Sequence, residues 1–97
     1  MASRVSFTPQ ARDDLIAIKA WIAEHDESAA DRIASRIQQT AAMFGQFPML
    51  GRKGKVEGTR EFSVTGLPYL IVYAIVSKME VDIVTIIHTR RMYPSDD

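Results

Sequence analysis

The sequence predicts an α+β fold, in which a short strand and a helical hairpin precede a mainly antiparallel sheet. Apolar side chains recur at helical spacing over residues 9–24 and 29–45, which predicts two amphipathic helices. Residues 59–65, 69–77 and 81–88 alternate in polarity or are rich in β-branched side chains, which predicts three strands. Short links join these three strands. We therefore expect an antiparallel meander with the helical hairpin packed on one face.

Length and composition indicate one domain and an intracellular setting. The chain has 97 residues, so we expect a single domain over residues 1–97. It contains no cysteine, which excludes disulfides and cysteine-ligated metals and fits a reducing compartment. Residues 1–7 do not resemble a signal peptide, and the longest apolar run, residues 70–76, is too short to span a bilayer. We expect a cytoplasmic protein.

The N-terminal part reads as strand, helix, helix. Residues 4–7 alternate and predict a first strand, which we expect to join the sheet. Thr8 is suited to cap a helix that begins at Pro9, because proline is tolerated at the first helical position. The predicted second helix begins near residue 29, with Ser28 and Asp31 as a weak capping box, and stops near Gly45.

A glycine-rich polar stretch, residues 51–58, follows the second helix, and we interpret it as a flexible surface loop. The next strand, residues 59–65, places Arg60 on the same face as Phe62 and Val64. Tyr69 and Tyr73 share one face of the strand at residues 69–77, where aromatic side chains usually pack.

The last strand, residues 81–88, is apolar on both faces and is therefore predicted to be central in the sheet. Strict alternation places Val81, Ile83 and Ile87 on one face and Val84 and Ile86 on the other. Directly after this strand come the polar side chains that we take as the candidate site, His88, Arg90, Arg91 and Tyr93, and then Pro94. A rigid strand positions such groups better than a loop does.

Charge gives little support for a general nucleic-acid-binding role. The formal net charge is zero, whereas proteins that bind nucleic acid non-specifically are usually basic. The charges are uneven, because residues 32–60 hold six basic side chains and one acidic one. We interpret the basic loop within that stretch as a solvated surface.

The ordered set of features resembles a known family. A strand and a helical hairpin lead to Pro48 and Gly51, followed by Gly58-Thr-Arg-Glu61, Leu67-Pro-Tyr69 and the closing run His88-Thr-Arg-Arg-Met-Tyr-Pro94. This arrangement, over nearly the whole chain, resembles the RelE/ParE superfamily of toxins from bacterial type II toxin–antitoxin systems, and the ParE branch most. The ParE resemblance implies a growth-inhibiting toxin that acts on DNA gyrase and is neutralised by a ParD-like antitoxin.

One function open at this stage is a RelE-like ribosome-dependent mRNA endoribonuclease. Metal-free RNA cleavage needs a general base, cations for the phosphorane and a proton donor. His88, Arg60 and Tyr93 are the candidate catalytic residues, with Arg90 and Arg91 as further phosphate ligands. Strand parity argues against this set, because Arg60 should share the core face and pair at the strand end with a carboxylate such as Glu57. A partly buried His88 that satisfies backbone carbonyls is an equally good interpretation.

The second function is a protein-binding inhibitor, and it is the one we favour. Arg90, Arg91 and Tyr93 form its expected target-binding tail, because arginine, tyrosine and methionine are enriched at interfaces. Antitoxin binding is expected near Trp21 on the first helix and at the sheet face of Tyr69 and Tyr73, as an added helix or strand.

We expect no metal and no cofactor, and a toxin–antitoxin hetero-oligomer, with two copies of each chain as one possible composition. A toxin fold that has lost its toxicity also fits the sequence.

Overall fold

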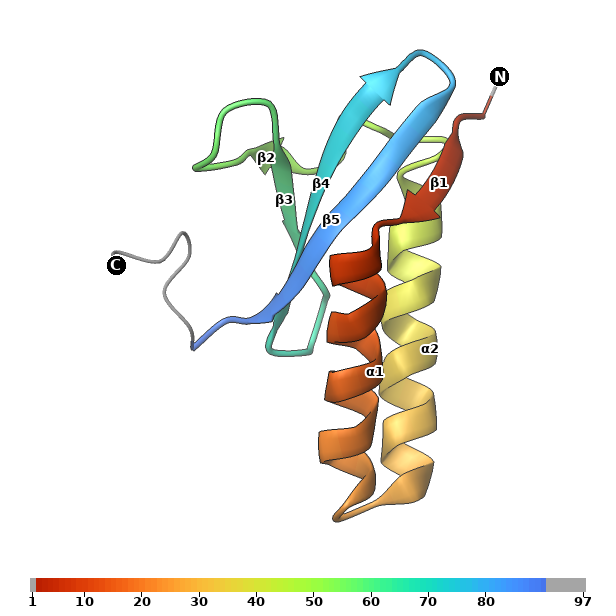
Figure 1. Cartoon of the computed structure of the whole chain (residues 1–97), viewed down its shortest axis with the longest axis vertical. Coiled ribbons are helices and arrows are strands. Elements are labelled where there is room, and N and C mark those ends of the chain that lie inside the picture. Colours follow the sequence, from red (N-terminus) through yellow and green to blue (C-terminus); the bar gives the residue numbers. More distant parts are fainter. Residues whose placement is uncertain (1, 91–97) are drawn as a thin grey trace.

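The computed structural model describes residues 2–90 and places the elements in the predicted order (Figure 1). They are β1 (Arg4–Phe7), α1 (Pro9–Ala23), α2 (Glu27–Met43), β2 (Arg52–Lys53), β3 (Arg60–Ser63), β4 (Tyr69–Ser77) and β5 (Glu80–His88). The five strands form one sheet in the order β1-β5-β4-β3-β2, in which β1 is parallel to β5 and the other pairs are antiparallel. The predicted α+β class is confirmed.

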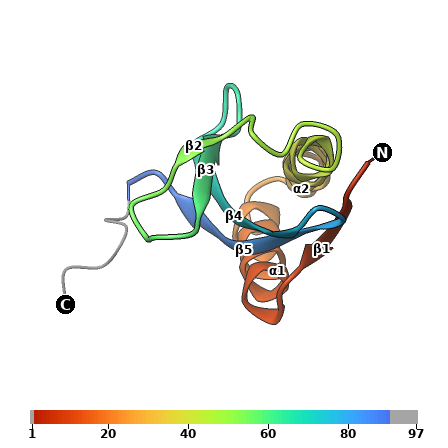
Figure 2. The ribbon, with the colours of Figure 1, turned by 90° about the horizontal axis from the view of Figure 1, so that it is seen from above.

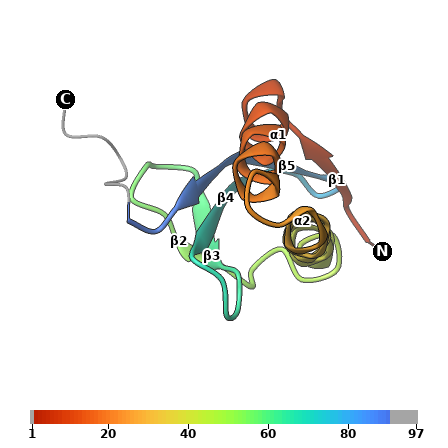
Figure 3. The same cartoon turned by 90° about the horizontal axis from the view of Figure 1, so that it is seen from below.

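The sheet is strongly curved. Viewed along the helices, β2 and β3 turn away from β1, β5 and β4, and α2 lies on the concave side (Figure 2). The opposite view shows α1 against β5 (Figure 3). The hairpin extends beyond the sheet at the end where α1 turns into α2, so the last turns of α1 are covered on one side only (Figure 1).

β5 lies inside the sheet between β1 and β4, as the sequence predicts, but its two faces are not those expected from strict alternation. Val72 pairs with Thr85 whereas Tyr73 pairs with Ile83, so Val84 is an extra residue on β5 and forms a bulge. The bulge reverses the alternation. Ile86 therefore joins Val81 and Ile83 in the core, while Ile87, which was expected there, is only half-buried.

Thr8 begins α1 as predicted and also attaches the helix to β5. Its Oγ1 accepts a hydrogen bond from the Ala11 amide at 3.1 Å, which is the N-cap contact. The same hydroxyl donates to the Val84 carbonyl at 3.0 Å, and the Thr8 amide donates to the Ile83 carbonyl at 3.1 Å. One residue thus fixes both the start of the helix and its position along the strand.

The predicted start of the second helix is wrong by two residues. Helix α2 begins at Glu27, because Asp26 caps it by accepting a hydrogen bond from the Ala29 amide at 3.0 Å. Ser28 is already inside the helix, and Asp31, its expected capping partner, instead pairs with Lys19 of α1 at 3.2 Å. An aspartate two residues earlier replaces the predicted capping box.

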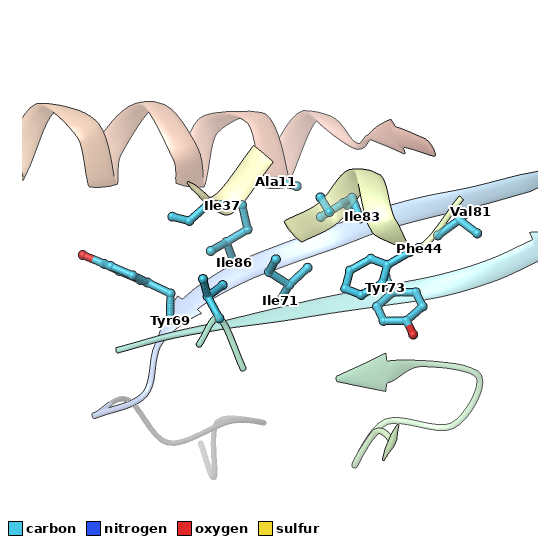
Figure 4. Packing of buried hydrophobic residues seen from close by; sticks show 11 residues of the cluster. Ala11, Ile37, Phe44, Tyr69, Ile71, Tyr73, Val81, Ile83 and Ile86 are labelled. Carbon is cyan, nitrogen blue, oxygen red and sulfur yellow. The ribbon is translucent and has the colours of Figure 1, made fainter. Parts of the chain in front are cut away.

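Tyr73 anchors the far end of the core (Figure 4). Its ring stacks on Phe44, with centroids 3.9 Å apart and planes at 12°. Its hydroxyl donates to the Pro48 carbonyl at 2.7 Å and accepts from the Gly51 amide at 2.8 Å. A Cβ on Gly51 would lie 2.9 Å from the Tyr73 ring and 2.7 Å from the Glu61 carbonyl, so only glycine allows this approach.

The stretch at residues 51–58, interpreted above as a flexible loop, is partly a strand. β2 pairs Arg52 with Glu61 and Lys53 with Arg60. Glu61 is only 2% exposed, and its carboxylate accepts hydrogen bonds from the Arg52 guanidinium at 3.2 Å and the Lys55 amide at 3.0 Å. A buried carboxylate that the sequence gave no reason to single out therefore orders this segment.

We predict that Tyr73→Phe lowers the free energy of unfolding by about 1–3 kcal/mol, because the Gly51 amide and the Pro48 carbonyl lose their partner. Urea titration measures the change. Tyr69→Phe is the matched control, since no hydrogen bond of the Tyr69 hydroxyl is seen within residues 2–90, and we expect it to change stability by less than about 1 kcal/mol. Equal effects of the two variants would contradict the anchoring role of Tyr73.

Candidate functional site

A groove of about 500 Å³ lies between α1 and the C-terminal end of β5. One wall is the second half of α1, and the other is the end of β5 with the first residue of β4. Its lining is largely apolar and aromatic, with one carboxylate and one guanidinium. The lining residues are Asp14, Ala17, Ile18, Trp21, Tyr69, Ile86, His88 and Arg90. The groove exists because β5 runs obliquely to α1 and the two diverge towards the C-terminal end of β5 (Figure 1).

The groove begins where β1 ends. β1 covers the edge of β5 as far as Phe7, which pairs with Ile83. Beyond that point α1 stands where a further strand would lie, and Asp14 takes over part of the strand's role. Its Oδ2 accepts hydrogen bonds from the Ile86 amide at 3.0 Å and from the Thr85 hydroxyl. Gln10 donates to its Oδ1 at 2.8 Å. A side chain thus satisfies an edge amide that no strand reaches.

His88 and Tyr69 form the end of the groove. Their rings meet edge to face, with centroids 5.4 Å apart and planes at 81°. His88 Nδ1 accepts a hydrogen bond from the Arg90 amide at 3.1 Å, so the neutral ring carries its proton on Nε2. The expected bonding of His88 to backbone carbonyls is thus replaced by a bond to a backbone amide. Burial raises the pKa of the Tyr69 phenol, because the phenolate is poorly solvated there.

The structure does not bring together Arg60 and His88, the two candidate catalytic residues of the ribonuclease hypothesis that lie within residues 2–90. Arg60 pairs with Tyr73, whereas His88 pairs with Tyr69. Four residues of β4 separate these positions, which is about 13 Å along the strand. The Arg60 guanidinium bonds to the carbonyls of Gly51 at 2.9 Å and Met49 at 3.4 Å, and not to Glu57 as expected. These bonds hold the Arg60 guanidinium on the β2 side of the sheet.

The residues expected to bind partners are placed differently. Trp21 is 64% exposed and lines the groove, together with Tyr69 and the exposed Arg90. Tyr73 is fully buried, so the expectation that it contacts an antitoxin is wrong: both its ring and its hydroxyl are used inside the core. Arg91 and Tyr93 lie outside the described residues.

Comparisons with known proteins identify the family. Residues 5–93 match the family described as ParE toxin of type II toxin-antitoxin system, parDE. The chain belongs to the ParE toxin family. It is 33% identical over 91 residues to "Putative toxin Y4kP" of Sinorhizobium fredii, a match that covers 94% of this chain and 93% of that protein.

The fold of this ParE-family chain is shared with a solved structure, "Chromosomal ParDE TA system from P. aeruginosa". The TM-score is 0.80 at 20% sequence identity, and the match covers 90% of this chain and 96% of the other. At that identity, the likeness concerns the fold alone.

Residues 2–90 contain neither a membrane-spanning helix nor a cluster of metal-binding side chains. No helix in this range has the length and apolar character needed to cross a membrane. No three histidine, aspartate or glutamate side chains in the same range lie close enough together to hold a metal ion.

Sequence reasoning missed Asp14. The available signal was an acidic side chain directly beside the buried helical stripe of Ala11, Leu15 and Ile18. An acid at that position either costs stability or has a specific partner, and here the partner is the edge of β5.

We predict that Asp14→Ala lowers the free energy of unfolding by about 1–3 kcal/mol, because it leaves the Ile86 amide without an acceptor. Asp13→Ala, at the exposed neighbouring position, is the matched control and should be nearly neutral. The measurement is denaturant unfolding of both variants beside the parent protein. A neutral Asp14→Ala would show that the β5 edge does not need this carboxylate.

We predict that Tyr69 titrates above the ordinary tyrosine pKa of about 10. The unfolded chain then loses this proton first, so the stability contributed by Tyr69 is complete below about pH 10 and falls as the pH rises through the folded-state pKa. The difference in phenolate absorbance between the parent protein and Tyr69→Phe measures the pKa. In Tyr69→Phe, stability should decline less between pH 9 and pH 11, and a Tyr69 midpoint at or below 10 would contradict its burial.

Proposed function

We propose that this ParE-family chain inhibits growth by binding DNA gyrase and that a ParD-like antitoxin neutralises it. The observation that carries the proposal is the family match over residues 5–93, because the ParE branch is the one whose resemblance implies gyrase as target. Neutral net charge agrees with a protein target, since binding to RNA would favour a basic surface.

The geometry of the site supports a binding role over RNA cleavage. Cleavage needs a base and phosphate-binding cations within reach of one scissile bond. In this chain Arg60 bonds to Gly51 and Met49, and its strand position is about 13 Å from that of His88. Binding needs no such convergence and requires only a surface that is held rigidly.

Arg90 is the first residue of the proposed target-binding tail. It is exposed and follows the central strand β5, with its amide held by the His88 ring. The proposed tail continues to Arg91 and Tyr93. Guanidinium and phenol groups provide large contact area and directional hydrogen bonds, which is why such side chains recur among the energetically dominant residues of interfaces.

The groove beside this tail is the proposed antitoxin site. Trp21 and Tyr69 give it an apolar lining, and Arg90 lies at its end. An antitoxin bound there would therefore touch the first residue of the tail.

The test is a supercoiling assay with gyrase, run beside an mRNA integrity assay in a translating extract, on protein separated from its antitoxin. We expect loss of supercoiling and intact mRNA. The combined substitution of Arg90, Arg91 and Tyr93 by alanine should weaken gyrase inhibition by about tenfold or more, because such interface side chains typically contribute over 1 kcal/mol each.

The matched control is the double substitution Lys53→Ala and Lys55→Ala, which removes two exposed cations in and directly after β2. It should leave inhibition unchanged. Normal supercoiling with cleaved mRNA would overturn the proposal in favour of the ribonuclease. Full inhibition by the folded triple variant would retain gyrase as target and refute the tail.

A further inference from the structure

A second groove, of about 420 Å³, lies between α2 and the turn that joins β3 to β4. Its lining residues are Arg32, Ile33, Ser35, Arg36, Gln39 and Leu67. Seen along the helices from either end, this turn lies on the side of the molecule where α2 lies, and α1 lies on the other side (Figure 2, Figure 3). The α2 groove shares no lining residue with the groove between α1 and β5.

The α2 groove combines apolar side chains with hydrogen-bond donors. Ile33 and Leu67 are half-buried and pack against the core, so they form its apolar base. The other four lining residues are exposed and all have side chains that can donate hydrogen bonds. None of the six is acidic. Such a lining suits an acidic segment that also carries an apolar side chain.

The two arginines of the α2 groove are not neutralised within the described part of the chain. Arg32 and Arg36 are four residues apart on α2, and like charges at that spacing weaken a helix. Within residues 2–90 neither forms a salt bridge, and the neighbouring acid, Asp31, pairs with Lys19 of α1 instead. Arg36 Nη2 donates to the Thr65 carbonyl at 2.6 Å, which holds this guanidinium beside the turn.

The turn of the α2 groove, residues 65–68, also reaches the base of the proposed target-binding tail. Its first carbonyl, that of Thr65, accepts from Arg36, and its last, that of Pro68, accepts from the Thr89 amide at 2.9 Å. The tail begins at the next residue. The Cα atoms of Thr65 and Pro68 can be no more than about 11 Å apart, which is well within the span of one protein interface. One target can therefore cover both the tail and the α2 groove.

These observations favour an acidic protein segment over the phosphates of a nucleic acid. Guanidinium groups bind carboxylates through paired, charge-assisted hydrogen bonds. A phosphate backbone would satisfy the arginines but would offer no apolar side chain to Ile33 and Leu67. The formal net charge of zero also gives little general attraction to nucleic acid.

We propose that the target-binding surface extends from the tail across the 65–68 turn to α2, where Arg32 and Arg36 pair with carboxylates of an acidic segment of gyrase. This inference rests on the proposed function, since it takes gyrase as the partner. It adds a second contact area to the target surface, one that lies outside the groove proposed for the antitoxin.

The first experiment measures the Kd of the free toxin for gyrase in the absence of DNA. The double variant Arg32→Glu and Arg36→Glu should raise this Kd about tenfold or more, because two ion pairs become two repulsions. The matched control, Lys53→Glu with Lys55→Glu, makes the same change in net charge at two exposed lysines that do not line the α2 groove, and it should leave the Kd unchanged. An unchanged Kd in the folded arginine variant would overturn the inference.

A second set of variants separates charge from structure, because Arg36 also bonds to the turn. Within residues 2–90 no hydrogen bond of the Arg32 side chain is seen, so Arg32→Glu leaves the turn intact and should still raise the Kd for gyrase about threefold. Replacing both arginines by lysine keeps the charge and should retain most of the affinity. An equal loss of affinity in the lysine and glutamate double variants would assign the arginines a structural role and contradict the inference.

The Kd for the antitoxin serves as the measure of correct folding. It should be the same in the parent protein and in all these variants, because the proposed antitoxin groove shares no residue with the α2 groove. A variant that loses gyrase affinity and keeps antitoxin affinity is therefore folded and has lost a target contact. Parallel loss of both affinities in Arg32→Glu would contradict a separate contact area.

Two other outcomes are distinct. If the free toxin binds a DNA duplex, and the glutamate double variant loses that affinity while its Kd for gyrase stays unchanged, the arginines bind phosphates and the inference is wrong. If the parent protein neither binds gyrase nor affects supercoiling, the proposed function fails, and this inference fails with it. Inhibition of gyrase by the parent protein and the arginine variants alike would refute the α2 contact alone.

Discussion

The structure depends on how the edge of β5 is covered. β5 is longer than β1, and the pairing of β1 with β5 ends at Phe7. Helix α1 takes over from there, first through Thr8, which bonds to Val84, and then through Asp14, which bonds to Ile86. These contacts bind the helical hairpin to the sheet. They also leave His88 beyond the reach of the helix, and the groove follows directly from that mismatch in length.

The two ends of the β4–β5 pair differ in whether their polar side chains are bonded within the fold. At one end Tyr73 stacks on Phe44, holds Pro48 and Gly51 through its hydroxyl, and lies beside the β2–β3 segment ordered by Glu61. Polar groups at that end are used within the fold. At the other end Tyr69 and His88 meet over an open groove (Figure 4 shows Tyr69 and Tyr73 at opposite ends of the core).

This asymmetry gives a small chain both a packed core and an open groove lined by apolar and aromatic side chains. β5 is held by hydrogen bonds to β4 and β1 and by side chains of α1, so Arg90, two residues after its end, starts from a fixed point. Arg90 also lines the groove, so the groove and the residues that follow β5 meet at this side chain.

The sequence by itself determined the order of elements and the central position of β5, because hydrophobic periodicity and β-branched side chains are local signals. It also determined the cap at Thr8 and the placement of Tyr69 and Tyr73 on one face of their strand, but not that Tyr73 is closed off in the core. Only the tertiary structure decided the rest. The bulge at Val84 moved Ile86 into the core, since register depends on the partner strand. The role of Asp14 depends on Ile86, 72 residues away in the sequence, and the role of Glu61 depends on Arg52, its partner across the β2–β3 pair. The separation of Arg60 from His88 likewise required the strand order, because spacing along a chain does not specify which end of a sheet each residue reaches.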